Sequence, residues 1–355
     1  MKEDPLVLNI IGVMSGTSLD GVDLAHCTFD YSGEAVSHRL NACITIPYTE
    51  EWSKKLSTLH ASGAMEYAST HVAYGRLLGQ MVHEFMEQVS LPVDFVSSHG
   101  HTIFHQPGSG FTSQIGEGAA LAAECGIPVI CDFRTGDVAH GGQGAPLVPI
   151  GDDLLFNEFA YCLNLGGFAN ISTREDHRRI AYDICPVNIV LNHFARLRGI
   201  SFDRDGMLAS TGRLNEELLE RLNQIAYYNM PPPKSLGREW VETEVLPLVT
   251  SHYNPEDILR TFTEHIAIQI GKGVIAGIRG EVLVTGGGAF NAFLVERIRN
   301  HCVLPLHIPD RNTVEFKEAL IFAFLGMLRV YGKPNCLSSV TGANKDTCGG
   351  TIYLP

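Results

Sequence analysis

The order of apolar and polar residues predicts a strand–turn–strand unit that occurs once in each half of the chain. Residues 6–13 and 22–29 are two short runs of β type that are joined by small residues. In the second half, residues 161–165 and 168–172 form a comparable pair around Gly166-Gly167, and a glycine pair between two such runs is typical of a hairpin turn. The same local design is therefore expected twice.

Helical patterns alternate with further strands after each pair. Apolar residues recur at helical spacing over 72–85 and 262–274, and a strand is predicted at 281–285. Three glycines follow that strand, a helix is expected to begin near Asn291, and a last helix is expected over 318–330. Strands that alternate with helices indicate an α/β architecture.

Length, charge and cysteine usage restrict the class of protein. A chain of 355 residues is long enough for two domains, each with its own core. The net charge of -13 argues against a nucleic-acid partner, because phosphate backbones require clustered Lys and Arg. The nine cysteines contain no C-x-x-C pair, and no signal peptide or membrane-spanning run is apparent. We therefore expect a cytoplasmic protein with free thiols and no membrane partner.

The first turn has the composition of an anion-binding loop. Ser15, Gly16, Thr17, Ser18 and Asp20 lie between the first two strands. A turn of this composition can present hydroxyls and successive backbone N–H groups to an anion. The turn lacks the Gly-Lys-Ser/Thr of a P-loop and leads into a strand rather than a helix, which excludes the dinucleotide fingerprint. A hairpin that simply needs glycine would explain Gly16 but not the surrounding hydroxyls and carboxylate.

Two later glycine turns extend this interpretation. Asn164, Gly166 and Gly167 belong to the second hairpin, which could hold another phosphate. Gly286, Gly287 and Gly288 stand between a strand and a helix N-terminus, where bare backbone suits phosphates or a flat base. Two phosphate-type hairpins followed by a glycine-rich strand-to-helix turn are typical of an actin/hexokinase-like nucleotide cleft.

A histidine cluster allows two interpretations. Ser98, His99, His101 and His105 lie close in sequence, and imidazole is a frequent metal ligand. No acidic residue lies between these histidines, and on a single strand His99 and His101 would share one face while His105 would lie beyond it. Contacts to a polar substrate are favoured over a metal site, and structural histidines remain an alternative.

Charged residues near strand ends are the remaining candidates. Arg134 and Asp137 follow a predicted strand, where α/β proteins usually build their sites, although Asp137 fits a structural network equally well. Asp183 follows another strand-like run and can be a general base or a helix cap. The stiff segment 231–239 carries Lys234 and Arg238, which either reach a phosphate or carboxylate or lie in solvent.

These motifs, in this order, resemble the anhydro-N-acetylmuramic acid kinase family over nearly the whole chain. The resemblance is carried by the following segments: 16–23, 98–100, 114–116, 132–134, 141–149, 164–171, 232–239 and 340–343. It implies two ribonuclease-H-like domains of the actin/hexokinase type with a cleft between them, and a homodimer. We expect the N-terminal domain at 1–132, completed by 330–355, and the C-terminal domain at 133–329.

The resemblance also implies a reaction. ATP, water and 1,6-anhydro-N-acetylmuramic acid would give ADP and N-acetylmuramic acid 6-phosphate, a step in recycling cell-wall sugars. Asp183 would be the general base, and Mg2+ would be held near Asp20. Contacts to the nucleotide would come from Gly16, Thr17, Ser18, Leu19, Asp20, Gly21, Val22, Asp23, Asn164, Gly166, Gly167, Gly286, Gly287 and Gly288, and contacts to the sugar from Ser98, His99, His101, Arg134 and Glu318.

The chain departs from the family pattern at two places. The family usually has Asp-Thr-Gly-Pro-Gly-Asn around the base, whereas this chain has Ile184, Cys185 and Val187 after Asp183, and His101 stands where glutamine is usual. A kinase acting on another sugar is therefore one alternative. The others are a metal-dependent hydrolase that uses the histidine cluster, and a nucleotide-binding protein without catalysis.

Overall fold

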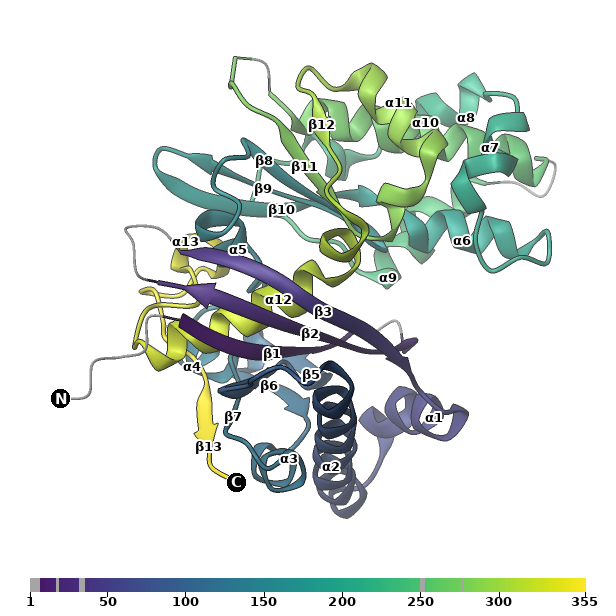
Figure 1. Cartoon of the computed structure of the whole chain (residues 1–355). Helices are drawn as coiled ribbons and strands as arrows, with labels where there is room; N and C mark the ends of the chain where they lie inside the picture. Colours follow the sequence, from purple (N-terminus) through teal and green to yellow (C-terminus); the bar gives the residue numbers. More distant parts are fainter. Residues whose placement is uncertain (1–6, 17–18, 32–35, 250–252, 276) are drawn as a thin grey trace. The chain divides into compact units, whose positions relative to one another are not determined.

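The chain is organised as two compact units, each built around one main sheet. The computed structural model describes residues 7–16, 19–31, 36–249, 253–275 and 277–355. One unit comprises residues 1–155 and 316–355, and the other comprises residues 156–315. Figure 1 shows the strands and helices of both.

The first unit contains a six-stranded sheet in the order β13-β7-β4-β1-β2-β3. Strands β1, β2 and β3 form an antiparallel meander, and β4 and β7 continue in parallel from the other side of β1. Its strands are β1 (Val7–Ser15), β2 (Gly21–Asp30), β3 (Ser37–Pro47), β4 (Phe95–Ser98), β7 (Val129–Cys131) and β13 (Thr351–Tyr353), with a separate hairpin of β5 (His101–Gln106) and β6 (Phe111–Ile115). Its helices are α1 (Glu50–Thr58), α2 (Ala64–Val89), α3 (Gly118–Cys125), α4 (Thr135–Ala139), α5 (Pro149–Leu154), α12 (Arg311–Val330, from residue 316) and α13 (Ser338–Thr341).

The second unit repeats this plan with five strands in the order β10-β9-β8-β11-β12. Again the first three strands form an antiparallel meander, and the fourth is parallel to the first. The strands are β8 (Tyr161–Leu165), β9 (Phe168–Glu175), β10 (Arg178–Pro186), β11 (Val282–Thr285) and β12 (Leu306–His307). The helices are α6 (Asn188–Arg196), α7 (Met207–Thr211), α8 (Glu216–Asn223), α9 (Arg238–Trp240), α10 (Pro255–Gly273) and α11 (Ala292–His301). The shared order confirms the predicted α/β fold with two ribonuclease-H-like domains.

Alternation along β1 explains the three layers of the first unit. Ile11 and Val13 belong to the core that includes Tyr74 and Leu78 of α2, because successive side chains of a strand point to opposite faces. On the other face Gly12 packs against α12, where a Cβ atom would lie 1.9 Å from the carbonyl oxygen of Ala319. Only glycine allows that approach, and Figure 1 shows α12 along this sheet.

The division between the units differs from the boundaries expected at residues 132 and 330. Residues 133–155 belong to the first unit because Asp137, which is fully buried, ties this segment to the C-terminal region. Its carboxylate accepts hydrogen bonds from the Thr341 hydroxyl at 2.8 Å and from the backbone N–H of Gly144 at 2.7 Å. Residues 316–329 also belong to the first unit, because α12 covers its sheet. Asp137 therefore has the structural role that the sequence left open.

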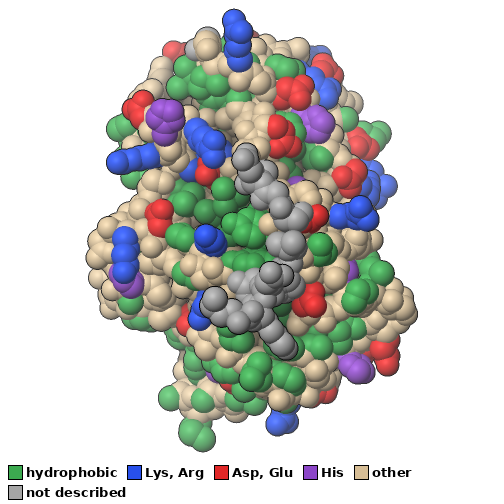
Figure 2. Space-filling model, turned by 60° about the vertical axis from the view of Figure 1, so that its left-hand side comes forward, with side chains coloured by type: hydrophobic (Ala, Val, Ile, Leu, Met, Phe, Trp, Pro, Cys, Tyr) green, Lys and Arg blue, Asp and Glu red, His purple; other side chains and the backbone are tan. Residues whose placement is uncertain are grey.

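Surface composition agrees with the acidic character of the chain. On the face shown in Figure 2, the Lys and Arg side chains are scattered among acidic and polar side chains instead of forming one basic patch. Within the described ranges, none of the helices combines the length and the apolar character that a membrane crossing requires.

Candidate functional site

Asp183 lies in β10, and its carboxylate is held from two directions. It is paired across the sheet with Asn170 of β9, and the Asn170 side-chain amide donates to its Oδ1. The backbone N–H of Leu236 donates to Oδ2 at 2.8 Å. A bulge between Asp183 and Cys185 shifts the strand register at this point, and bulges often re-aim side chains beside active sites. Both carboxylate oxygens are therefore fixed by N–H donors.

The backbone of Asp183 is held by the segment that carries Leu236. Its N–H donates to the carbonyl oxygen of Lys234 at 3.1 Å, and its own carbonyl oxygen accepts from the Tyr227 hydroxyl at 2.7 Å. The half-buried Lys234 ammonium does not extend to a carboxylate. It lies 4.7 Å from the centre of the Tyr227 ring and donates to the Tyr227 carbonyl oxygen at 3.1 Å. This segment thus contacts Asp183 through its backbone.

The surroundings of Asp183 suit a general base. Burial raises the pKa of its carboxyl, while the hydrogen bonds from Leu236 and Asn170 act in the opposite direction. The net shift is upward, which brings the carboxylate closer to the range in which it accepts a proton near neutral pH. Each oxygen retains acceptor capacity beyond the one donor that already holds it.

We expect Asn170→Ala to move the acidic limb of the pH–rate profile to higher pH. The Asn170 amide favours the ionised form of Asp183, so its removal raises the pKa of the base, and more of the enzyme is protonated at a given acidic pH. The check is kcat/KM measured from pH 4.5 to 8. Thr173→Ala, in the same strand, is the control, because its hydroxyl donates to the Ala160 carbonyl oxygen rather than to Asp183. An unchanged limb in Asn170→Ala would contradict the role.

An amide relay links Asp183 to the glycine turn after β11. Asn164 Nδ2 donates to Asn170 Oδ1 at 3.3 Å, which orients the Asn170 amide with its N–H groups toward Asp183. Gly286 has a φ of 81°, and a Cβ atom there would lie 2.4 Å from Asn164 Oδ1. Glycine at this position is thus required for the turn to pack against the relay.

The three glycines of this turn have different surroundings. A Cβ atom at Gly288 would lie 2.7 Å from the Leu165 side chain, so this glycine, like Gly286, allows close packing. At Gly287 a Cβ atom would meet nothing within 4 Å, and the residue is exposed. Packing therefore explains two of the glycines but not Gly287. In the second hairpin, Gly167 is also open, while its carbonyl oxygen accepts from the N–H of Val187 at 2.8 Å.

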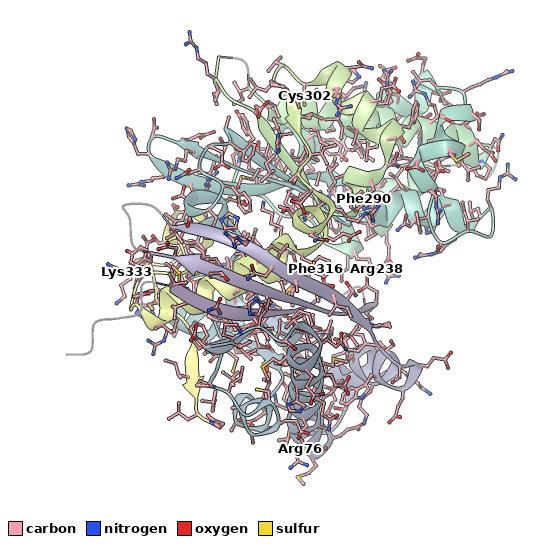
Figure 3. All side chains as sticks on the ribbon, viewed as in Figure 1. Arg76, Arg238, Phe290, Cys302, Phe316 and Lys333 are labelled. Carbon is pink, nitrogen blue, oxygen red and sulfur yellow. The ribbon has the colours of Figure 1, made fainter. Side chains whose placement is uncertain are left out.

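A pocket of about 670 Å³ adjoins Gly287 within the second unit. Its wall includes the Phe290 ring, which is labelled in Figure 3, and the Arg311 guanidinium, which lies 4.5 Å from the centre of that ring. The other lining residues are Asn188, Leu191, Asn192, Phe202, Asp203, Arg204, Asp205, Thr263, Asn291 and Glu315. Sequence reasoning missed most of this pocket, because its residues come from several segments that share no motif.

In the first unit, the predicted anion-binding turn follows β1. Thr17 and Ser18 lie outside the described residues. Leu19 has a φ of 61°, and its N–H points to the Gly16 carbonyl oxygen at 3.5 Å. Asp20 is exposed after this turn.

The residues after Asp20 return to the sheet. Gly21 allows close packing against β3, where a Cβ atom would lie 2.5 Å from the carbonyl oxygen of Ile46, and Val22 is fully buried in the core. Asp23 Oδ1 accepts a hydrogen bond from the Thr45 hydroxyl at 2.6 Å. Gly21 and Val22 therefore have packing roles, whatever their backbone groups contact.

His99 and Arg134 form a neutral–cationic pair in the first unit. The chain leaves β4 at Ser98 and turns at Gly100, which has a φ of 71°, so His99 and His101 do not lie on one strand. His99 Nδ1 lies 2.8 Å from the Gly100 carbonyl oxygen, and Arg134 donates to Nε2 at 2.8 and 3.1 Å. Burial and the Arg134 charge hold the pKa of His99 well below its usual value.

Glu318 belongs to the same electrostatic neighbourhood. It lies on α12, and burial raises the pKa of its carboxyl, with Asp23 adding repulsion and Lys317 and Arg134 acting in the opposite direction. Arg134 also donates to the carbonyl oxygen of Gly144 at 2.6 Å, which fixes its guanidinium. The first unit thus brings together a fixed cation, a neutral imidazole and a carboxyl, which suits a polar, uncharged or anionic ligand.

The histidine cluster lacks the geometry of a metal centre. His99 Nε2 is occupied by a guanidinium, and His105 Nδ1 lies 3.1 Å from the Thr112 hydroxyl. Across the part of the chain that the structure describes, no group of three or more His, Cys, Asp or Glu side chains is placed to hold a metal ion. Nothing in this arrangement favours the metal-dependent hydrolase.

The positions that depart from the expected pattern around Asp183 face the interior. Ile184, Cys185 and Val187 are all buried in the core of the second unit, with exposed fractions of 4%, 0% and 0%. Their added bulk is therefore accommodated in the hydrophobic core of the second unit.

Comparison with known proteins gives one consistent result. Residues 8–355 match the sequence model of a family described as anhydro-N-acetylmuramic acid kinase. The chain is 35% identical over 378 residues to an anhydro-N-acetylmuramic acid kinase of Vibrio cholerae, covering 97% of this chain and 98% of that protein. It is 36% identical over 366 residues to the Pseudomonas syringae protein of the same name, with 97% and 98% covered. For the Bacillus cereus protein of that name the identity is 33% over 379 residues, with 98% and 97% covered.

Proposed function

Because this chain belongs to the anhydro-N-acetylmuramic acid kinase family, we propose that it converts 1,6-anhydro-N-acetylmuramic acid, ATP and water to N-acetylmuramic acid 6-phosphate and ADP. The observation that carries the proposal is the half-buried Asp183 carboxylate, whose two oxygens are each held by an N–H donor. A fixed carboxylate of raised pKa is what the hydrolytic half of this reaction requires.

Asp183 acts on the water molecule. Its carboxylate takes a proton from the water as the water oxygen bonds to the anomeric carbon, and the bond from that carbon to the bridging 6-oxygen breaks. The freed 6-oxygen bonds to the γ-phosphorus of ATP, whose bond to the β–γ bridging oxygen breaks, and ADP leaves. The Asn164–Asn170 relay and the Leu236 N–H keep the carboxylate in one orientation, so little reorganisation is needed before the proton moves.

Groups in the first unit are proposed to bind the sugar. Arg134 is fixed by His99 and by Gly144, and a guanidinium held in this way suits the lactyl carboxylate of a muramic acid. Glu318, with its raised pKa, and Ser98 and His101 are assigned to the polar groups of the ring. This charge pattern supports an anionic amino sugar over a neutral hexose.

Residues around the glycine turns are proposed to bind ATP. The pocket beside Gly287 offers the Phe290 ring and the Arg311 guanidinium for a purine, and Gly287 itself leaves room for phosphates. Mg2+ usually keeps several of its waters and binds through one or two carboxylates plus substrate phosphates, a requirement that the single exposed Asp20 carboxylate fits. Bound there, the ion would neutralise charge on the transferring phosphoryl group.

The test is ADP release from Mg-ATP with and without 1,6-anhydro-N-acetylmuramic acid, with the product identified by mass. Sugar-dependent ADP and a product that has gained one water and one phosphoryl group would support both halves of the reaction. N-acetylmuramic acid and N-acetylglucosamine, which lack the anhydro bridge, are the controls for the alternative of another sugar. Turnover of either control in preference to the anhydro sugar would overturn the assigned substrate.

We propose a cytoplasmic homodimer that takes part in recycling cell-wall sugars, in keeping with family membership and with nine cysteines that are not joined in disulfides. Light scattering of the purified protein measures the oligomeric state directly, and a monomer at micromolar concentration would contradict the dimer.

A further inference from the structure

Four hydrogen-bonded side chains lie at the carboxyl end of β1 in the first unit. Ser15 is the last residue of that strand. Its Oγ lies 2.6 Å from the Tyr48 hydroxyl, 2.8 Å from His101 Nδ1 and 2.9 Å from the Tyr74 hydroxyl. The two tyrosine hydroxyls are hydrogen-bonded to each other as well. We call Ser15, Tyr48 and Tyr74 the hydroxyl ring. Three hydrogen bonds join its members to one another, and a fourth joins Ser15 to His101.

The hydrogens available for these four bonds can be counted. Each hydroxyl carries one hydrogen, and burial raises the pKa of Tyr48 and raises that of Tyr74 well above its usual value, so both phenols stay protonated. The geometry makes Tyr74 the donor to Ser15. Tyr48 must then donate to Tyr74, because the Tyr74 hydrogen is already used. Ser15 must in turn donate to Tyr48.

No hydroxyl hydrogen remains for the fourth bond, between Ser15 and His101. Its hydrogen therefore has to come from Nδ1 of the imidazole. Burial lowers the pKa of His101 to about 4, so at neutral pH the ring carries a single hydrogen and Nε2 has a free lone pair. Within the described part of the chain, Nε2 has no hydrogen-bond partner, although only 3% of the residue is exposed.

We propose that the hydroxyl ring fixes His101 as the Nδ1–H tautomer, so that Nε2 is an acceptor that selects an N–H or O–H donor on the sugar. This inference rests on the proposed function, since it assigns the ligand of His101 to the sugar of that reaction. It gives His101 a specificity-determining role that differs from that of its neighbours. His99 Nε2 already accepts from Arg134, whose remaining N–H groups can only donate to a ligand.

The polarity of the contact identifies the chemical class of the partner group. An acceptor cannot hydrogen-bond to an ether or carbonyl oxygen, so Nε2 excludes those groups and favours a ring hydroxyl or the acetamido N–H. Arg134 can only donate hydrogen bonds to the sugar, whereas His101 Nε2 can only accept one. Together they distinguish sugar groups that accept hydrogen bonds from those that donate them. A site that leaves a buried acceptor unpaired disfavours analogues lacking the donor.

The tautomer is measured directly by long-range 1H–15N NMR of uniformly labelled protein at pH 7.5. His101→Gln assigns the signal by its disappearance. We expect the shift of a protonated nitrogen at Nδ1 and of an unprotonated nitrogen at Nε2, with Nε2 moving further when 1,6-anhydro-N-acetylmuramic acid is added. A protonated Nε2 in the unmodified protein would overturn the inference, whatever the kinase activity.

Opening the hydroxyl ring provides the second test. In Tyr48→Phe the Ser15 hydrogen is released from Tyr48 and becomes free to donate to Nδ1, which permits the Nε2–H tautomer. We expect a protonated fraction at Nε2 and a KM for the sugar raised about three- to tenfold, the range for one neutral hydrogen bond, with kcat within twofold. Tyr67→Phe is the matched control, because its hydroxyl bonds to Ser113 outside the ring.

Substitutions of His101 itself separate hydrogen bonding from packing. In His101→Gln, the amide N–H can donate to Ser15 while the carbonyl oxygen serves as acceptor, so KM should stay within about twofold of the unmodified protein. His101→Phe fills similar space with no acceptor and should raise KM about three- to tenfold. Equal KM values in both variants would overturn the assignment. Absence of turnover with the sugar would count against the proposed function, and the NMR measurement would still decide the tautomer.

Discussion

Asp183→Asn is expected to lower turnover of the anhydro sugar by at least about a thousandfold, within the 10²–10⁴ range of general-base catalysis. The asparagine side chain has the same shape as aspartate and can accept the Leu236 N–H at its oxygen. It cannot take a proton from water, because its amide is not basic. Asp183 is not part of the glycine turns that are proposed to bind ATP. We therefore expect the ATP affinity to change by less than about twofold, which is less than the loss of one typical hydrogen bond would cause.

The comparison requires a matched replacement in the same hairpin. Asp176 lies at the tip of the β9–β10 hairpin, is exposed and has a φ of 46°, a conformation that asparagine adopts readily. Asp176→Asn should therefore leave turnover unchanged. The measurements are ADP release under saturating sugar and calorimetric titration with ATP. If Asp183→Asn retained more than about a tenth of the rate, the loss would be far smaller than general-base catalysis predicts. Another group would then have to be the base.

Gly287→Val is expected to weaken ATP binding by about a hundredfold, at the upper end of the 1–3 kcal/mol that overpacking costs. No atom lies within 4 Å of the position that the new Cβ atom would take, and the backbone of Gly287 is not in the left-handed conformation. The variant should therefore fold normally. The added methyl groups would occupy the mouth of the pocket beside Phe290. Loss of affinity without loss of stability would mark a contact with the nucleotide.

Gly108→Val is the control for this substitution. Gly108 also has no atom within 4 Å of the Cβ position, and it lies in the β5–β6 connection of the other unit. The free energy of unfolding of both variants should lie within about 0.5 kcal/mol of that of the unmodified protein, as is usual for substitutions at surface positions. Calorimetry with ATP then separates them. Unchanged affinity in Gly287→Val would contradict the assignment of the turn after β11 to the nucleotide.

Local patterns in the sequence predicted the elements that carry the site. The short runs of β type at residues 6–13 and 22–29, and the glycine pair at 166–167, predicted the hairpins, because strand propensity and turn chemistry are local properties. The helix after Asn291 was predicted for the same reason, and in the structure the Asn291 side chain accepts from the N–H of Leu294 as its cap. These features depend on neighbours within a few residues.

Features that depend on distant contacts were not predicted. The pocket beside Gly287 is formed by residues 188–315, which share no pattern along the chain. Asp137 was equally consistent with a site or a structural network, and only the buried hydrogen bond from Thr341, 204 residues away, decides between them. If His99 and His101 lay on one strand they would share a face, but β4 ends at Ser98 and Gly100 adopts a left-handed conformation, so the two histidines are separated by a turn.

Residues 156–315 interrupt the first unit in the sequence. Synthesis of the first unit therefore begins before that of the second unit but ends after it. At about 5–20 residues per second, the ribosome needs roughly 8–32 seconds to make that segment after residue 155 has been added. During this interval the nascent sheet of the first unit has neither α12 on its second face nor β13 at its edge. The second unit, which is continuous, can fold first, so the nascent N-terminal segment is the part that needs protection from aggregation during synthesis.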